Sequence, residues 1–175
     1  MNIDLLMAKR HSKHEVRKIA DWIGNDPDRF VHLANVFFGD SKGKVQRSAW
    51  VMSEVGMRHP NLFLPYMDAF MAALDNPKHD AVQRNILKVI ADTQMPLSED
   101  IQGELVGKCF DLLLDPKRPV AIHVHAMQCI ANYLPQYPDL AVELKTIIED
   151  GMEEGSAGFR SRGRKILKQI GRIGY

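Results

Sequence analysis

The chain has 175 residues, of which 45% are hydrophobic and 26% are charged, and its formal net charge is +1. This balance is typical of a globular protein and excludes a disordered chain or one embedded in a membrane. Asp4, Lys9 and Arg10 interrupt the first apolar residues, so we expect neither a signal peptide nor a membrane span. The sequence therefore predicts a single cytoplasmic domain over residues 1–175.

The first predicted helix runs from Ser12 to Ile23. Val16, Ile19 and Ile23 lie on one face of it, and Ser12 is followed three residues later by Glu15, the pattern of a capping box. We expect the helix to end near Gly24.

Four pairs of helices are predicted to follow, each joined by a turn that is rich in Asp, Pro or Gly. A repeat of about 37 to 40 residues is typical of a helical solenoid, because a helix pair that cannot bury its apolar face alone stacks on copies of itself. The sequence therefore predicts an all-α fold. The pairs occupy approximately residues 27–60, 61–96, 97–137 and 138–175, with helices over Pro27–Phe38 and Val45–Arg58, Leu62–Leu74 and Val82–Thr93, Ile101–Leu113 and Ile122–Leu134, and Leu140–Ile148 and Phe159–Ile173.

Short motifs recur at the turns: residues 75–77 read Asp-Asn-Pro, residues 80–84 read Asp-Ala-Val-Gln-Arg, and the Val-Gln-Arg triplet recurs at residues 45–47. These motifs resemble HEAT repeats of the armadillo-like superfamily. The third and fourth pairs lack this Val-Arg pattern, and Ile-His-Val stands at residues 122–124. The resemblance implies a right-handed α–α superhelix, in which the second helices line an inner surface that usually binds protein and sometimes nucleic acid.

Both ends of the chain are basic, and the last predicted helix most strongly so. Residues 156–175 contain six Lys or Arg and no acid, and residues 1–20 contain five against two acids. Cations that recur every fourth residue share one helix face, which could contact an acidic partner or phosphates. The alternative is the solvated face of a terminal capping helix. The candidate partner-binding residues are Arg47, Arg84, Arg160, Arg162, Arg164, Lys165 and Lys168.

Trp50 and Glu54 suggest a second class of function. They lie one helical turn apart, and Arg47 precedes them. Bacterial alkylpurine DNA glycosylases with a HEAT-like architecture, which the chain resembles, hold a damaged nucleotide between a Trp and an Asp at this spacing with an Arg; here Glu replaces the Asp. The equivalent residues of the next repeat are Leu87 and Ala91, so repeat alignment favours Trp50 as a core residue.

The remaining polar residues form no recognisable catalytic or metal-binding pattern. His123 and His125 point to different sides of a helix, and His11 and His14 have no third ligand nearby, so we expect no metal, no cofactor and no catalytic residue. Two cysteines fall within apolar helical patterns and are predicted to be reduced core residues; they are Cys109 and Cys129.

These observations favour a non-catalytic module that binds a protein partner, with an acidic partner as one candidate. The alternative is a protein that binds nucleic acid or acts on DNA and is related to the HEAT-like DNA glycosylases. A third alternative is a structural subunit, in which Phe63, Phe70 and Met71 on the first helix of the second pair seal a homodimer.

Overall fold

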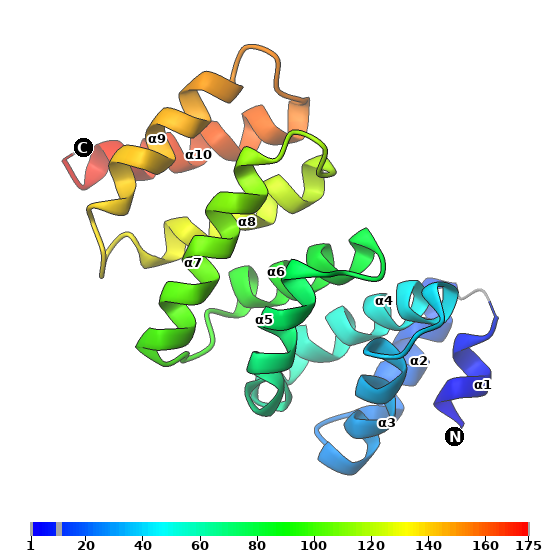
Figure 1. Ribbon diagram of the computed structural model, residues 1–175. Helices are drawn as coiled ribbons and strands as arrows, with labels where there is room; N and C mark the ends of the chain where they lie inside the picture. The colour runs from blue at the N-terminus through cyan, green and yellow to red at the C-terminus, as the bar shows by residue number, and fades with distance from the viewer. Residues whose placement is uncertain (1, 10–11, 175) are drawn as a thin grey trace. The chain divides into compact units, whose positions relative to one another are not determined.

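The computed structural model describes residues 2–9 and 12–174 (Figure 1). These residues form ten α-helices and two short 3₁₀-helices, with no β-strand, which confirms the all-α prediction. The chain divides into two compact units, with the boundary between Leu97 and Ser98. Within the described residues, no helix combines the length and the apolar character that crossing a membrane requires.

The first unit contains six α-helices among its described residues, and the second contains four. The helices of the first unit are α1 (Ile3–Met7), α2 (Lys13–Ile23), α3 (Pro27–Phe37), α4 (Lys42–Arg58), α5 (Met67–Asp75) and α6 (Asp80–Thr93), with 3₁₀-helices at Pro60–Leu62 and Leu64–Tyr66 between α4 and α5. Those of the second unit are α7 (Glu99–Leu114), α8 (Val120–Tyr133), α9 (Leu140–Gly151) and α10 (Ala157–Arg172).

The ends of α2 are those that the sequence predicts. Ser12 Oγ accepts a hydrogen bond from the Glu15 amide at 3.2 Å, and the Glu15 carboxylate accepts one from the Ser12 amide at 2.7 Å. This reciprocal pair is a capping box. Gly24 follows the helix with φ +53°, a conformation that glycine adopts without strain.

Three elements differ from the prediction. The first helix of the second pair begins at Met67 instead of Leu62, because Pro65 lies inside the predicted span and cannot supply an amide donor, and two 3₁₀-helices precede α5 instead. Helix α4 begins at Lys42, so Gly43 lies in its first turn. Helix α1 has only five residues and was not predicted, since so short a segment shows no apolar period.

The core of the first unit is built around α4, which contacts α2, α3 and α6. Beside it, phenylalanine rings from α3, the 3₁₀ segment and α5 form a buried cluster, in which the ring centroids of Phe63 and Phe70 are 4.6 Å apart. Phe63, Phe70 and Met71 are all buried. The sequence-based suggestion that these residues seal a homodimer is therefore wrong, because the aromatic cluster uses them inside the unit.

The core of the second unit is built around α8, which contacts α7, α9 and α10. Cys109 and Cys129 are free thiols and both are buried, as predicted. A hydrogen bond with Cys129, together with burial, raises the pKa of the Cys109 thiol well above its usual range.

Hydrogen bonds between residues about one repeat apart connect different helices and turns within each unit. In the first unit, Arg58 donates to Asp21, and Lys78 donates to Asp40. In the second unit, the Gln169 side chain donates to the carbonyl oxygen of Ala131. These pairs have sequence separations of 37, 38 and 38 residues, which matches the period read from the sequence.

Candidate partner-binding surface

One face of helix α10 is buried against α8 and α9, and the opposite face is exposed to solvent. Ser156 caps the helix by accepting a hydrogen bond from the Phe159 amide at 3.2 Å. Phe159, Ile166 and Ile170 are buried in the contacts with α8 and α9. A Cβ atom on Gly163 would lie 2.8 Å from Ile148, so this glycine lets α10 approach α9 closely.

The cations of α10 lie mostly on the side away from this core. Arg164, Lys165, Lys168 and Arg172 are exposed, and Arg160 is half-buried. We call these five residues the α10 basic face. Within residues 2–9 and 12–174, none of them forms an ion pair or a side-chain hydrogen bond, whereas several cations elsewhere do pair with acids. The paired cations include Arg29, Lys44, Arg58, Lys78, Lys108 and Arg118.

Neighbouring acids do not neutralise the α10 basic face by direct contact. Helix α9 carries exposed acids, among them Glu143, Glu149 and Asp150. In the described part of the chain, no ion pair joins α9 to α10. The two helices therefore present charges of opposite sign to solvent within the same unit.

Arg162 differs from the other cations of α10. Its guanidinium donates a hydrogen bond to the Gln128 side chain on α8, and Gln128 in turn donates to Asn132 at 2.7 Å. The Gln169 side chain adds a second connection, at 2.9 Å, to the carbonyl oxygen of Ala131. Arg162 therefore ties α10 to α8, a position that the sequence pattern did not distinguish from that of the exposed cations.

The two candidate arginines of the first unit have different environments. The Arg47 Nε donates to the carbonyl oxygen of Met7 at 2.6 Å, so this side chain holds α1. Arg84 occupies the equivalent repeat position on α6 and is exposed. It has no hydrogen-bonding or ionic partner among the described residues.

Trp50 is 43% exposed, so the prediction that it belongs to the core is wrong. The buried stripe of α4 runs through Val45, Ala49 and Met52, and helical spacing places Trp50 on the other side of the helix. Repeat alignment misled here because the equivalent Leu87 of α6 is buried.

Glu54 lies one turn after Trp50, and its carboxylate is already paired with a cation. It accepts a hydrogen bond from Arg58, whose guanidinium also donates to Asp21. The hydrogen bond with Asp21 is the main reason why the pKa of Arg58 is raised above its ordinary value. The acid next to Trp50 is thus one member of a surface ion-pair network that joins α2 to α4.

A family model described as a HEAT repeat domain matches residues 4–170. The chain belongs to this HEAT repeat family. No curated protein and no solved structure matches it. HEAT repeats are helical modules that commonly mediate protein interaction, and the match spans helices of both compact units.

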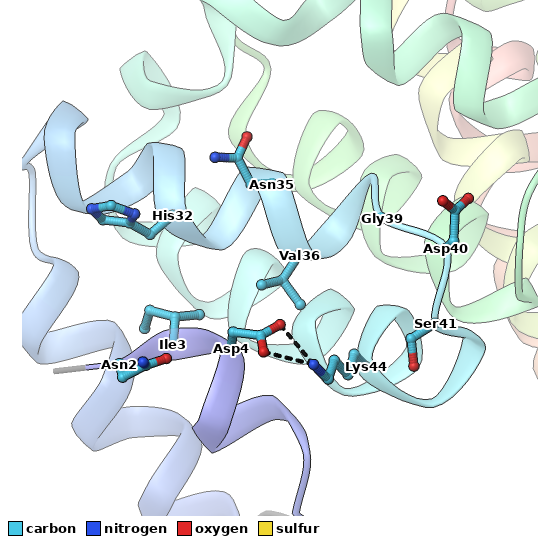
Figure 2. A pocket seen from close by; sticks show the side chains of 10 residues that line it. All are labelled: Asn2, Ile3, Asp4, His32, Asn35, Val36, Gly39, Asp40, Ser41 and Lys44. Carbon is cyan, nitrogen blue, oxygen red and sulfur yellow. Dashed lines mark hydrogen bonds and ion pairs between the residues drawn. The ribbon is translucent and has the colours of Figure 1, made fainter.

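The first unit of this HEAT repeat chain also contains an open pocket that no sequence pattern indicated. It has a volume of about 790 Å³ and lies beside α1, with α3, the turn that follows α3 and the start of α4 as its other walls (Figure 2). The residues that line it are Asn2, Ile3, Asp4, His32, Asn35, Val36, Gly39, Asp40, Ser41 and Lys44.

The charged groups of this cavity are paired. The Lys44 ammonium lies 2.7 Å from both carboxylate oxygens of Asp4, as Figure 2 shows. Asp40 accepts a hydrogen bond from Lys78, which is the main reason why the pKa of Asp40 is lowered. The His32 and Asn35 side chains, by contrast, have no hydrogen-bond partner within the described residues, and no sequence pattern signalled them because α1 itself was not predicted.

No group of three or more side chains suited to a metal ion occurs in the described ranges. The ring of His123 is hydrogen-bonded to the carbonyl oxygen of Asp115 at 3.0 Å, which is a structural contact at the turn between α7 and α8. His14 is exposed, and His11 lies outside the described residues.

Proposed function

We propose that this HEAT repeat chain is a non-catalytic module that binds a protein partner, and that the α10 basic face contacts an acidic segment of that partner. One observation carries the proposal: five cations on one helix lack ionic partners within the described chain. Exposed charges of one sign attract an oppositely charged surface and orient it during encounter, more than they add affinity.

The affinity of such an interface requires apolar contacts beside the charges. Ile173, which follows α10, is a large exposed apolar residue next to Arg172. Leu167, which lies between the cations and the buried stripe, is half-buried. We infer that the partner segment combines acidic residues with at least one bulky apolar side chain.

The experiment compares two charge-reversed variants of the full chain as baits in a quantitative pull-down. The test variant carries R160E, R164E and K168E. The control carries K13E, R17E and K18E, which makes the same change in charge at exposed positions of α2. We expect the test variant to lose the partners that the unchanged chain recovers, and the control to retain them.

Two results would contradict this proposal. Recovery by the α10 variant equal to that of the unchanged chain would remove the α10 basic face as the contact surface. An equal loss in both variants would show that net charge alone governs recovery. Circular dichroism of both variants checks that the helices are intact.

Nucleic-acid binding is the second candidate, favoured by the exposure of Trp50, because an exposed indole can stack on a base. A duplex or single-stranded DNA titration at several salt concentrations tests it. Affinity that falls linearly on a log–log plot against salt would support this candidate, and the absence of binding at low salt would end it. A glycosylase-related activity would further require an acid, and Glu54 is engaged by Arg58.

A further inference from the structure

The hairpin of α9 and α10 separates acidic from basic residues. Residues 139–154 contain six acids and one lysine, whereas residues 156–175 contain six Lys or Arg and no acid. Across the residues that the structure describes, none of these six acids forms an ion pair or a side-chain hydrogen bond. We call them the α9 acidic segment. They are all exposed, and they are Asp139, Glu143, Glu149, Asp150, Glu153 and Glu154.

The helix dipole does not account for this separation of charge. The C-terminal end of a helix favours cations, and the N-terminal end favours acids. Helix α9 instead carries Glu149 and Asp150 near its C-terminal end and has no cation in its last turn, and α10 has no acid in its first turn. Because local helix stability favours the opposite arrangement, the charges are better explained by a contact with another molecule.

The two helices of the hairpin run antiparallel (Figure 1). A Cβ atom on Gly163 would lie 2.8 Å from Ile148, and a Cβ atom on Gly151 would lie 2.6 Å from Phe159. The end of α9 therefore lies beside the start of α10, and the start of α9 lies beside the end of α10.

Residues at the same level of the two helices are complementary. Near the connecting turn, Glu149 on α9 is level with Arg160 and Arg164 on α10. At the other end of the hairpin, Val142 on α9 is 59% exposed, and Ile173, which follows α10, is 39% exposed. Val142 and Glu149 are seven residues apart and share a helix face. Helix α9 thus combines acids with a bulky apolar side chain, which are the two features that the α10 basic face requires of its partner.

A two-fold axis parallel to these helices makes the hairpin complementary to itself. Such an axis places α9 of one copy over α10 of the other at the same level, and symmetry repeats the contact, so every acid–cation pair occurs twice. A two-fold axis that crosses the helices would place α9 over α9 and α10 over α10, which brings like charges together. Electrostatics therefore favours one arrangement of two copies.

We propose that the α10 basic face binds the α9 acidic segment of a second copy of this chain, in a two-fold symmetric dimer formed by the second unit. In this dimer, Val142 of one copy lies near Ile173 of the other. The inference rests on the proposed function, because it names the chain that carries the acidic segment. Since the paired charges are exposed, we expect the dissociation constant to rise about tenfold or more from low to high salt.

The test exchanges charges between two variants of the full chain, and sedimentation velocity over a concentration series measures their association. The α10 variant carries R160E, R164E and K168E, and the α9 variant carries E149K, D150K and E153K. We expect the unchanged chain to dimerise and each variant alone to be monomeric, because like charges then meet. An equimolar mixture of the variants should form a mixed dimer, because both contacts are rebuilt with their charges exchanged.

Two features of the design keep the test sharp. The K13E, R17E and K18E chain is the matched control, and it should dimerise as the unchanged chain does. The α9 variant places lysines where the helix dipole favours cations, so it should fold even if the α10 variant does not, and it should still be monomeric. Circular dichroism checks both variants.

Three results would overturn the inference: an unchanged chain that stays monomeric at the highest concentration, a folded variant that still dimerises alone, or a mixture of folded variants that stays monomeric. The pull-down then separates this failure from that of the proposed function. If the α10 variant loses its partners and the α9 variant retains them, the acidic segment belongs to a different protein and the proposed function stands. If the α10 variant also retains them, both proposals fail.

Discussion

Gly56 occupies a position on α4 where no side chain fits. It is buried, and an added Cβ atom would lie 2.4 Å from Phe63 and 2.8 Å from Val89. The glycine therefore brings α4 close to the 3₁₀ segment and to α6. Helical spacing aligns Gly56 with Val45, Ala49 and Met52 on the apolar stripe of α4, but periodicity alone does not show that the position excludes even a methyl group.

We predict that Gly56→Ala destabilises the chain by about 1–3 kcal/mol through overpacking, although alanine favours the helix intrinsically. Gly107→Ala in α7 is the matched control, because nothing lies within 4 Å of its added Cβ. This second change should stabilise the chain by about 0.5–1 kcal/mol. Urea unfolding measures both free energies, and shifts of the midpoint in the same direction would contradict the packing argument.

Trp50 shows where residue-level prediction fails. Its position opposite the Val45, Ala49 and Met52 stripe of α4 favours exposure, whereas its repeat-equivalent Leu87 favours burial. The structure exposes Trp50, because the face of a helix that packs is set by its own neighbours in space. Equivalent positions of a repeat share backbone geometry without sharing burial.

At the scale of the elements, one buried side chain closes the turn between α5 and α6. The Gln83 amide donates to the carbonyl oxygen of Leu74 at 2.6 Å, near the end of α5, where carbonyls lack partners within the helix. His123 makes the corresponding contact with Asp115 at the turn between α7 and α8. Two different residue types therefore perform the same function at equivalent positions of successive repeats.

We predict that Gln83→Met, which removes the donor and approximately preserves volume, destabilises the chain by about 1–3 kcal/mol because a buried carbonyl loses its partner. Gln46→Met is the control: Gln46 has the equivalent position in the preceding repeat but is exposed. It should change stability by no more than about 0.5 kcal/mol. If both variants lost the same free energy of unfolding in urea, the hydrogen bond of Gln83 would make no specific contribution to stability.

The helices were predictable where strong end signals exist. Ser12 with Glu15 fixed the start of α2, and Pro96 and Pro135 separated later helices from their successors. The short elements were not predictable. Helix α1 depends on contacts with α3 and α4, and the 3₁₀-helices around Pro65 depend on backbone geometry that no apolar period reveals.

At the scale of the whole molecule, the candidate surface was partly visible in the sequence. Cations every fourth residue share a helix face in any helix, so the row on α10 could be predicted. The sequence does not show which cations lack ionic partners, because only the fold brings distant residues together. Arg58 and Lys78 pair with acids that lie 37 and 38 residues away in the sequence.

The unfolding behaviour of the chain tests whether residues 1–175 form one cooperative domain, as the sequence predicts. Both tryptophans, Trp22 and Trp50, precede Leu97, so tryptophan fluorescence reports the first unit while circular dichroism reports helices of both units. Neighbouring repeats of helical-repeat proteins stabilise one another, so we expect the two signals to have the same midpoint in urea.

A conservative substitution in the core of the second unit provides a direct test of this prediction. Ile170 is buried on α10, and Ile170→Val should cost about 0.5–1.5 kcal/mol. If the chain unfolds as one domain, this change lowers the midpoint of tryptophan fluorescence, although both tryptophans belong to the first unit. A fluorescence midpoint that stays constant while the circular dichroism transition shifts or splits would show that the two units unfold independently. The repeats would then form two separate domains, because coupling between neighbours is what makes a repeat array cooperative.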